Sequence, residues 1–221
     1  MPKFLRENGL SVAIALLFVA TLAGQIASGH GAYNDDQRDH GDEPVTLGEY
    51  LRTGHFVEAT AENWESEFLQ MFLYVLLTAW LYQKGSSESR KLDAENPQDR
   101  DPREHRRRPN APKVVRKSSE LALKLYENSL SLAFLLLFLV SLWIHARGGL
   151  AEHNEELWAH GEPPVSLGEF ATDPEFWFQS MQNWQSEFLS LLAMVVLSIW
   201  LRQRRSPESK PVDAPHAETG T

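Results

Sequence analysis

The sequence predicts an all-α membrane protein. The expected fold is a four-helix transmembrane bundle made of two parallel tandem repeats, with short amphipathic helices in the outer loops. Three observations support this fold class. The chain of 221 residues contains an internal duplication, four long apolar blocks, and lysines and arginines that are concentrated in alternate loops.

The duplication covers most of the chain. Residues 7–89 align with residues 127–209 without a gap, and 33 of the 83 aligned positions are identical. Unrelated sequences agree at roughly one position in twenty, so the match indicates two copies of one unit. We assign repeat 1 to residues 1–90, a polar linker to 91–120, repeat 2 to 121–209 and a disordered tail to 210–221.

Each repeat contains two apolar blocks. A helix needs about 20 mostly apolar residues to cross a bilayer, and the second block of each repeat has only 14 uncharged residues, 68–81 and 188–201, which also suits a soluble helix. We predict membrane helices at about 9–28, 64–82, 125–146 and 184–202, with outer loops at 29–63 and 147–183. The first block also resembles a signal peptide, but its internal copy cannot be one, which favours retained helices.

Tryptophans flank the second block of each repeat. Trp64 and Trp80 are 16 residues apart, as are Trp184 and Trp200. This spacing is about 24 Å along a helix, close to the separation of the aromatic belts of a bilayer. We therefore predict these four residues as interface anchors, the alternative being core tryptophans of a soluble bundle.

The basic residues indicate the orientation. The segment 84–117 contains eleven lysines and arginines, whereas loop 29–63 has two against eight acids and loop 147–183 has one against seven. Positive residues remain on the cytoplasmic side. We therefore expect both termini and the linker to be cytoplasmic, in contact with the lipid bilayer and available to a protein partner through residues 84–117.

One motif, Asn-Trp-(Glu/Gln)-Ser-Glu-Phe-Leu, occurs in both repeats. It places polar side chains on one helix face at the edge of each second block. The candidate polar or ion site consists of Asn63, Ser66, Glu67, Asn183, Ser186 and Glu187. Two carboxylates with hydroxyl and amide oxygens suit a hard cation or a proton. The alternative is that these residues join helices by hydrogen bonds.

A second polar cluster lies at the opposite ends of the predicted helices. Its members are Glu7, Asn8, Ser11, Glu127, Asn128 and Ser131. Such clusters suit the mouth of a pore, and they equally suit the helix ends of any membrane bundle.

The outer loops contain histidines and helix-start signals. His153, Glu156 and His160 have the spacing of a helical metal site, but Tyr33 replaces His153 in repeat 1, so this is a weak candidate and we expect no cofactor. His40 and His160 are equivalent and suit pH-sensitive contacts. The residues 44–50 and their copy predict short amphipathic elements, and Asp173 before Pro174 predicts a helix start.

Several function classes are excluded or disfavoured. The net charge of −9 argues against a nucleic-acid partner, and the absence of cysteine excludes disulfides and thiolate chemistry. The sequence contains no Walker A loop, Gly-x-Ser-x-Gly or His-Glu-x-x-His motif. We therefore do not expect an enzyme.

The repeated motifs also carry a resemblance. The Glu-Asn-x-Leu-Ser and Asn-Trp-x-Ser-Glu-Phe-Leu segments, the His-Gly-x-x-Pro-Val-(Thr/Ser)-Leu-Gly loops and the Ser-Pro-Glu-Ser-Lys-Pro tail resemble a family of bacterial multi-pass membrane proteins with a domain of unknown function. The resemblance covers essentially the whole chain. It implies a bacterial plasma membrane protein and no activity.

Three functions follow as hypotheses. The first is a non-enzymatic scaffold or accessory membrane subunit. The second is a small cation or proton channel or transporter using Glu67 and Glu187, which also requires a homodimer because four helices make a thin wall for a pore. The third is a sensor of pH or envelope stress that uses the outer histidines.

Overall fold

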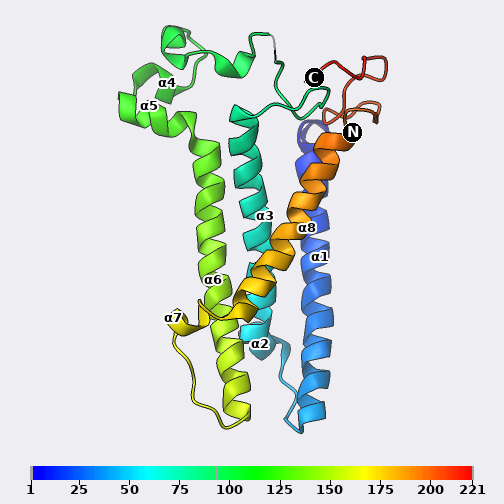
Figure 1. Cartoon of the computed structure of the whole chain (residues 1–221), viewed down its shortest axis with the longest axis vertical. Coiled ribbons are helices and arrows are strands. Elements are labelled where there is room, and N and C mark those ends of the chain that lie inside the picture. The colour runs from blue at the N-terminus through cyan, green and yellow to red at the C-terminus, as the bar shows by residue number, and fades with distance from the viewer. Residues whose placement is uncertain (1, 93, 221) are drawn as a thin grey trace. The chain divides into compact units, whose positions relative to one another are not determined.

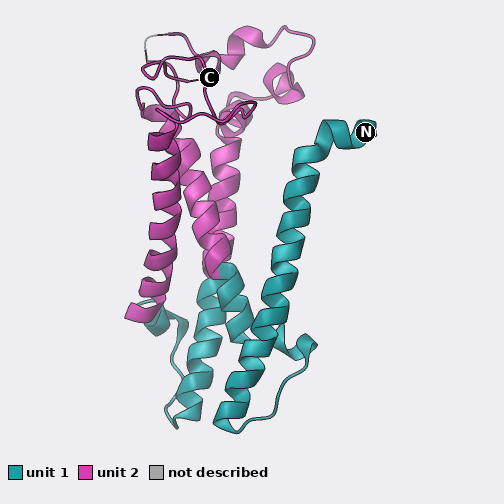
Figure 2. Cartoon of the chain, turned by 90° about the vertical axis from the view of Figure 1, so that its right-hand side faces the viewer, with its two compact units in different colours: residues 1–61, 144–172 teal, residues 62–143, 173–221 magenta. Residues whose placement is uncertain are grey.

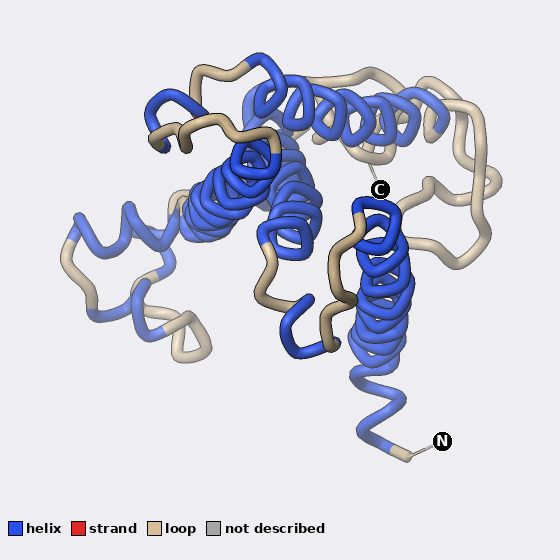
Figure 3. The backbone as a smooth tube through the Cα atoms, turned by 90° about the horizontal axis from the view of Figure 1, so that it is seen from below, coloured by secondary structure: helices blue, strands red, loops and turns tan. Residues whose placement is uncertain are grey.

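The computed structural model describes residues 2–92 and 94–220, and these residues form helices joined by turns, with no strand among them (Figure 1, Figure 3). The long helices are α1 (Lys3–His40), α3 (Gly54–Trp80), α6 (Ser129–Ala159) and α8 (Pro174–Leu197). The short helices are α2 (Leu47–Tyr50), η1 (Pro97–Asp99), η2 (Pro102–His105), α4 (Lys113–Lys117), α5 (Glu120–Glu127) and α7 (Leu167–Phe170). The predicted all-α class is confirmed.

The chain divides into two compact units, which Figure 2 distinguishes by colour. Unit 1 comprises residues 1–61 and 144–172, and unit 2 comprises residues 62–143 and 173–221. Unit 1 therefore contains α1, α2, α7, the first turns of α3 and the last turns of α6. Unit 2 contains the remainder of α3 and α6, together with α8, the linker and the tail.

The helices α1 and α6 extend well beyond the apolar blocks from which we predicted them. The expected ends lay near residues 28 and 146, whereas α1 continues to His40 and α6 to Ala159. Side chains one turn apart support the polar turns of α1, as in the ion pair of Arg38 with Asp35 at 2.5 Å. The turns that follow these helices contain Gly41 and Gly161, whose φ angles of 86° and 76° favour glycine.

An asparagine closes each helical hairpin of unit 1. Asn34 accepts a hydrogen bond from the Val45 backbone N–H at 2.8 Å and donates one to the Val45 carbonyl at 3.1 Å. Asn154 makes the same pair of bonds to Val165, at 2.7 and 3.2 Å. Positions 120 residues apart therefore fix the two extended loop segments in the same way.

The short helices after these loops begin with capping boxes. The Thr46 hydroxyl accepts from the Glu49 N–H at 3.4 Å, and the Glu49 carboxylate accepts from the Thr46 N–H at 2.7 Å. Ser166 and Glu169 repeat this arrangement at the start of α7. The predicted short elements in both outer loops are confirmed.

Glycines set the helix contacts in unit 1. A Cβ atom on Gly148 would lie 2.6 Å from the Glu58 backbone nitrogen, and one on Gly54 would lie 2.8 Å from the Gly148 carbonyl oxygen. Real Cβ atoms do not approach so closely, so α3 and α6 touch backbone to backbone at this crossing. A small residue on each helix is the usual basis for such contact.

In unit 2, the observed ends of the helices differ in part from the predicted ones. The helix expected over 125–146 is interrupted at Asn128, between α5 and α6. The predicted start of α8 is confirmed, because the Asp173 carboxylate accepts from the Glu175 N–H at 2.8 Å and Pro174 occupies the first turn. The helix ends at Leu197, before the Arg204 to which its pattern extends.

The tail, which composition suggested to be disordered, follows a defined path of turns over its described residues. The Lys210 side chain is 1% exposed, and its ammonium donates to the carbonyls of Gly85, Pro215, His216 and Glu218. Hydrogen bonds from a charged donor are among the stronger ones in proteins. These bonds connect the turns of the tail to one another and to Gly85.

Among the described residues, more polar than apolar residues are buried, which is the reverse of the pattern in a soluble protein. Only six apolar residues are buried, against fourteen polar or charged ones. Large apolar side chains are exposed along all four long helices, for example Leu16, Leu77, Leu136 and Leu192. Two helices, α1 and α6, are long and apolar enough to cross a membrane, so the structure supports two candidate spans where we predicted four.

We predict that Gly148→Ala destabilises the protein, because the added methyl group meets the α3 backbone and overpacking costs about 1–3 kcal/mol. Thermal unfolding in detergent measures the effect. Gly24→Ala is the matched control, because a Cβ there meets nothing within 4 Å and alanine favours a helix. Equal unfolding temperatures for the two variants would contradict the described crossing.

Candidate functional site

Side-chain hydrogen bonds join α3 to α8 within unit 2. The Trp184 indole N–H donates to the Glu65 carboxylate at 2.9 Å, and the Asn183 amide donates to Glu62. The Gln70 amide donates to the Glu187 carbonyl at 2.8 Å and to the Ser190 hydroxyl at 2.9 Å. We refer to Glu62, Glu65, Gln70, Asn183, Trp184 and Ser190 as the polar seam.

The polar seam overlaps only in part with the predicted ion site. Asn183 belongs to both sets, and Glu187 contributes its backbone carbonyl. The Glu67 side chain is exposed, although its charge acts on the carboxylate of Glu187. The buried acid is instead Glu65, two residues earlier, which has no exposed surface.

The serines of the predicted site do not reach across to the partner helix in any hydrogen bond described. The hydroxyl of Ser66 donates to the Asn63 carbonyl, and that of Ser186 donates to the Asn183 carbonyl, both at 2.8 Å. Each bond stays within its own helix. A serine in such a bond is satisfied without a ligand.

The four predicted anchor tryptophans have different surroundings. Trp80 and Trp200 are 75% and 55% exposed, as an interface residue requires, and Trp64 is 38% exposed. Trp184 instead packs inside unit 2, with its ring 6.2 Å from Phe138 and its N–H bonded to Glu65.

The second polar cluster is divided between the two units. In unit 1, Glu7 pairs with Lys3 at 3.9 Å, and the Asn8 amide donates to the carbonyl four residues earlier; Ser11 is exposed. In unit 2, Glu127 binds Arg103, and the Asn128 amide donates to the Lys124 carbonyl; Ser131 is half-buried. Each amide therefore bonds within its own turn of chain.

The outer histidines are tied to their own helices. His40 and His160 each bond the carbonyl four residues earlier, at 3.0 and 2.7 Å. His153 lies against the Phe170 ring at 5.4 Å. Across residues 2–92 and 94–220, no group of three histidines or acids is placed to hold a metal ion, so His153, Glu156 and His160 do not form a site.

A cluster that we did not predict lies in unit 1, beyond the apolar part of α6. Glu152 on α6 accepts a hydrogen bond from the His55 backbone N–H on α3. The His55 ring lies 5.4 Å from the Tyr33 ring and 6.0 Å from the Tyr50 ring. The Oε2 atom of Glu152 and the Nδ1 atom of His55 are both buried without a hydrogen-bond partner.

Two unpartnered buried polar atoms in one cluster are unusual, because nearly all such atoms are paired in native proteins. Burial and the neighbouring Glu155 raise the pKa of Glu152 to about 7. Burial lowers the pKa of His55. Sequence reasoning missed this cluster because Glu152, His55 and Tyr33 come from three helices, and Ala32 occupies the position equivalent to Glu152 in repeat 1.

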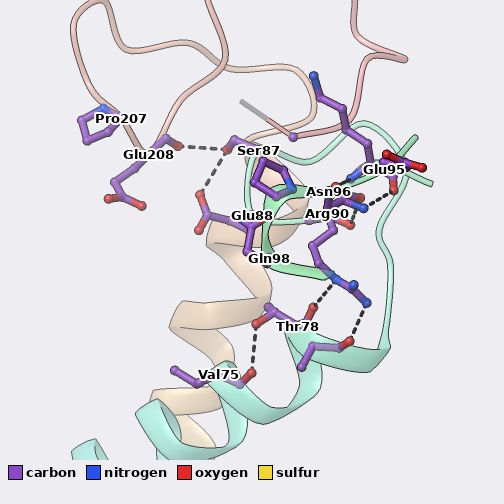
Figure 4. Close-up of a pocket in the computed structure, with 15 residues that line it drawn as sticks. Val75, Thr78, Ser87, Glu88, Arg90, Glu95, Asn96, Gln98, Pro207 and Glu208 are labelled. Atoms are coloured by element: carbon purple, nitrogen blue, oxygen red, sulfur yellow. Dashed lines mark hydrogen bonds between the residues drawn. The ribbon is translucent and has the colours of Figure 1, made fainter. Parts of the chain in front are cut away.

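A cavity of about 760 Å³ lies in the part of unit 2 formed by residues 75–98 and the tail (Figure 4). Arg90 donates to the Thr78 carbonyl at 3.3 Å, and the Ser87 hydroxyl joins Glu88 to the Glu208 carbonyl. The charges that line the cavity have both signs, so it does not specify a ligand.

The comparisons with known proteins name no activity for this chain. No curated protein and no solved structure matches the chain. A family model described as a domain of unknown function, DUF6766, matches residues 1–221. The chain therefore belongs to the DUF6766 family.

Proposed function

We propose that the protein is an integral membrane protein of the bacterial plasma membrane that acts without catalysis, as a scaffold or accessory subunit. The observation that carries the proposal is the inverted burial, with polar residues inside and leucine, phenylalanine and tryptophan outside. In water such a surface would aggregate. In a bilayer it is the expected arrangement, because lipid chains solvate apolar side chains and polar contacts hold the helices together.

All four long helices take part in the proposed topology. The helices α1 and α6 meet the length and hydropathy of a membrane span. The helices α3 and α8 support a further pair of crossings through their exposed apolar residues, among them Trp80, Leu189 and Trp200. The residues of the polar seam lie on these two helices. They lower the mean hydropathy of α3 and α8 below that of the candidate spans α1 and α6.

The charge distribution supports cytoplasmic termini. Acidic residues dominate the two hairpins between α1 and α3 and between α6 and α8, whereas lysines and arginines dominate the linker. The positive-inside rule then places the linker and tail in the cytoplasm and the hairpins outside. The two repeats enter the membrane in the same direction, which makes them parallel repeats.

The polar seam favours a static role over transport. Its buried carboxylate, Glu65, is bonded to Trp184, and the Gln70 amide has two acceptors on α8. A seam satisfied in this way fixes a helix pair and leaves no oxygen cluster for an ion. The linker, residues 84–117, is the surface through which we propose that a partner protein or a second copy of the chain binds.

A cation or proton path is the second candidate, because the charge of Glu67 acts on Glu187. Two carboxylates near one another at a helix edge are what such a path needs. A path would run through this pair, whereas a scaffold does not need either charge.

The topology is tested with single cysteines, which the natural chain lacks. We predict that Glu43→Cys and Glu162→Cys react in intact cells with a membrane-impermeant thiol reagent, and that Arg107→Cys reacts only after lysis. All three positions are exposed. Labelling of Arg107→Cys in intact cells, with the loop positions silent, would reverse the orientation. Equal labelling of all three would exclude membrane insertion.

The scaffold and the path are separated in proteoliposomes. We predict that the wild-type protein and the Glu67→Gln, Glu187→Gln double variant give the same proton and cation flux, equal to that of empty vesicles. Flux that depends on the wild-type carboxylates would replace the scaffold with the path. Thermal unfolding of the double variant checks that it remains folded.

A further inference from the structure

The Glu152 carboxylate is held in a confined position by the helix crossing of unit 1. A Cβ on Gly54 would collide with the backbone nitrogen of Glu152, so this turn of α6 lies directly on α3. One carboxylate oxygen accepts from the His55 N–H, and the other is buried without a partner. Although the Glu152 side chain as a whole is half-buried, this second oxygen has neither water nor a hydrogen bond.

The charges around Glu152 make its ionised form costly. Carboxylates act on it from its own helix, through Glu155 and Glu156, and from α3, through Glu58. Repulsion by like charges and loss of water both favour the neutral acid.

The remaining neighbours do not supply a counter-ion. Tyr33 and Asp36 face the cluster from α1, and Tyr50 faces it from α2. The His30 ring on α1 lies 5.6 Å from the Tyr50 ring, and its Nε2 is bonded to the Val45 carbonyl at 2.8 Å. Burial raises the pKa of both tyrosines, which are therefore neutral hydroxyls at physiological pH. His55 contributes its backbone N–H, while burial lowers the pKa of its ring, which disfavours its cationic form.

We propose that Glu152 is a proton-binding site, at which the carboxyl group takes up one proton from water at its unpartnered oxygen and thereby tightens the crossing of α3 and α6. The proton adds to the unpartnered Oε2, which becomes a hydroxyl donor, and no other bond is made or broken. Loss of the proton leaves a buried anion beside three carboxylates, and the crossing loosens to admit water. This site goes beyond the proposed membrane scaffold and does not depend on it.

The proposal assigns pH sensitivity to a group other than the outer histidines. His40 and His160 are exposed and bonded to their own helices, so their charge does not change a contact between helices. Glu152 lies between two helices, and a change in its charge acts on both. The close contacts of Gly54 and Gly148 between α3 and α6 would be lost when Glu152 ionises, because they require the two backbones to touch.

The test is thermal unfolding of the purified full-length protein in detergent between pH 5 and pH 8.5. Folding favours the neutral acid, so the stability that this group contributes is complete below the ordinary pKa of glutamic acid and is lost as the pH rises through the raised value of about 7. We expect the unfolding temperature of the wild-type protein to fall between pH 5 and pH 7 and to level off above that. Glu152→Gln, which mimics the protonated acid, should remove this fall and raise the unfolding temperature at pH 8.

Glu156→Gln is the matched control, because it removes an exposed carboxylate one turn away and should keep the transition. His55→Gln should also keep it, because the backbone N–H that binds Glu152 remains. A transition that survives in Glu152→Gln and disappears in His55→Gln would assign it to the histidine and overturn the proposal. A wild-type protein whose unfolding temperature does not fall between pH 5 and pH 7 would also overturn it, without need of any variant.

Discussion

The structure depends on the pairing of polar groups in its interior. Apolar burial is slight among the described residues, and hydrogen bonds and close glycine contacts join the long helices beside aromatic contacts such as that of Phe138 with Trp184. In the proposed bilayer setting this is expected, because a leucine gains nothing by moving from lipid to protein. Each buried polar group then needs a hydrogen-bond partner, and a buried group without one points to a site where a proton or ligand can bind. The unpartnered atoms of Glu152 and His55 mark such a place.

One face of the helix α6 carries polar or small residues along much of its length. Ser141, His145 and Gly148 are buried and recur at intervals of three and four residues, and Glu152 continues the same spacing. Between them, Trp143 and Arg147 are exposed. A single polar stripe therefore begins within the apolar part of the helix and ends at the proposed proton site, where glycine brings the α3 backbone into contact.

Local signals in the sequence were sufficient to predict much of the fold. Capping boxes, Asp173 before Pro174 and the apolar blocks act within a few residues, and the structure confirms the elements that they specify. The ends of α1 and α6 could not be placed, because their polar turns are supported by pairs such as Arg38 with Asp35 and by loop contacts such as Asn34 with Val45. Those contacts depend on the fold rather than on hydropathy.

The candidate site was predicted less well, for a related reason. Glu67 and Glu187 stand out in the sequence because both repeats contain them, whereas the buried Glu65 and the half-buried Glu152 have no acidic equivalent in the other repeat. The helices of each unit come from both repeats, so a contact between them joins unlike positions. Duplication therefore indicates the elements of the fold well and the positions of single charged groups poorly.

The central claim, that the long helices present apolar residues to lipid and polar residues to one another, is tested most directly by spin labels along α6 in a reconstituted bilayer. Single cysteines at positions 130–143 would carry the label, and collision with oxygen would report contact with lipid. The account predicts that oxygen collision is strongest at exposed positions such as Leu136 and Leu139, and weakest at the buried Ser141, with a helical period. Strong collision with a water-soluble reagent throughout the segment, with no helical period in the oxygen signal, would contradict it.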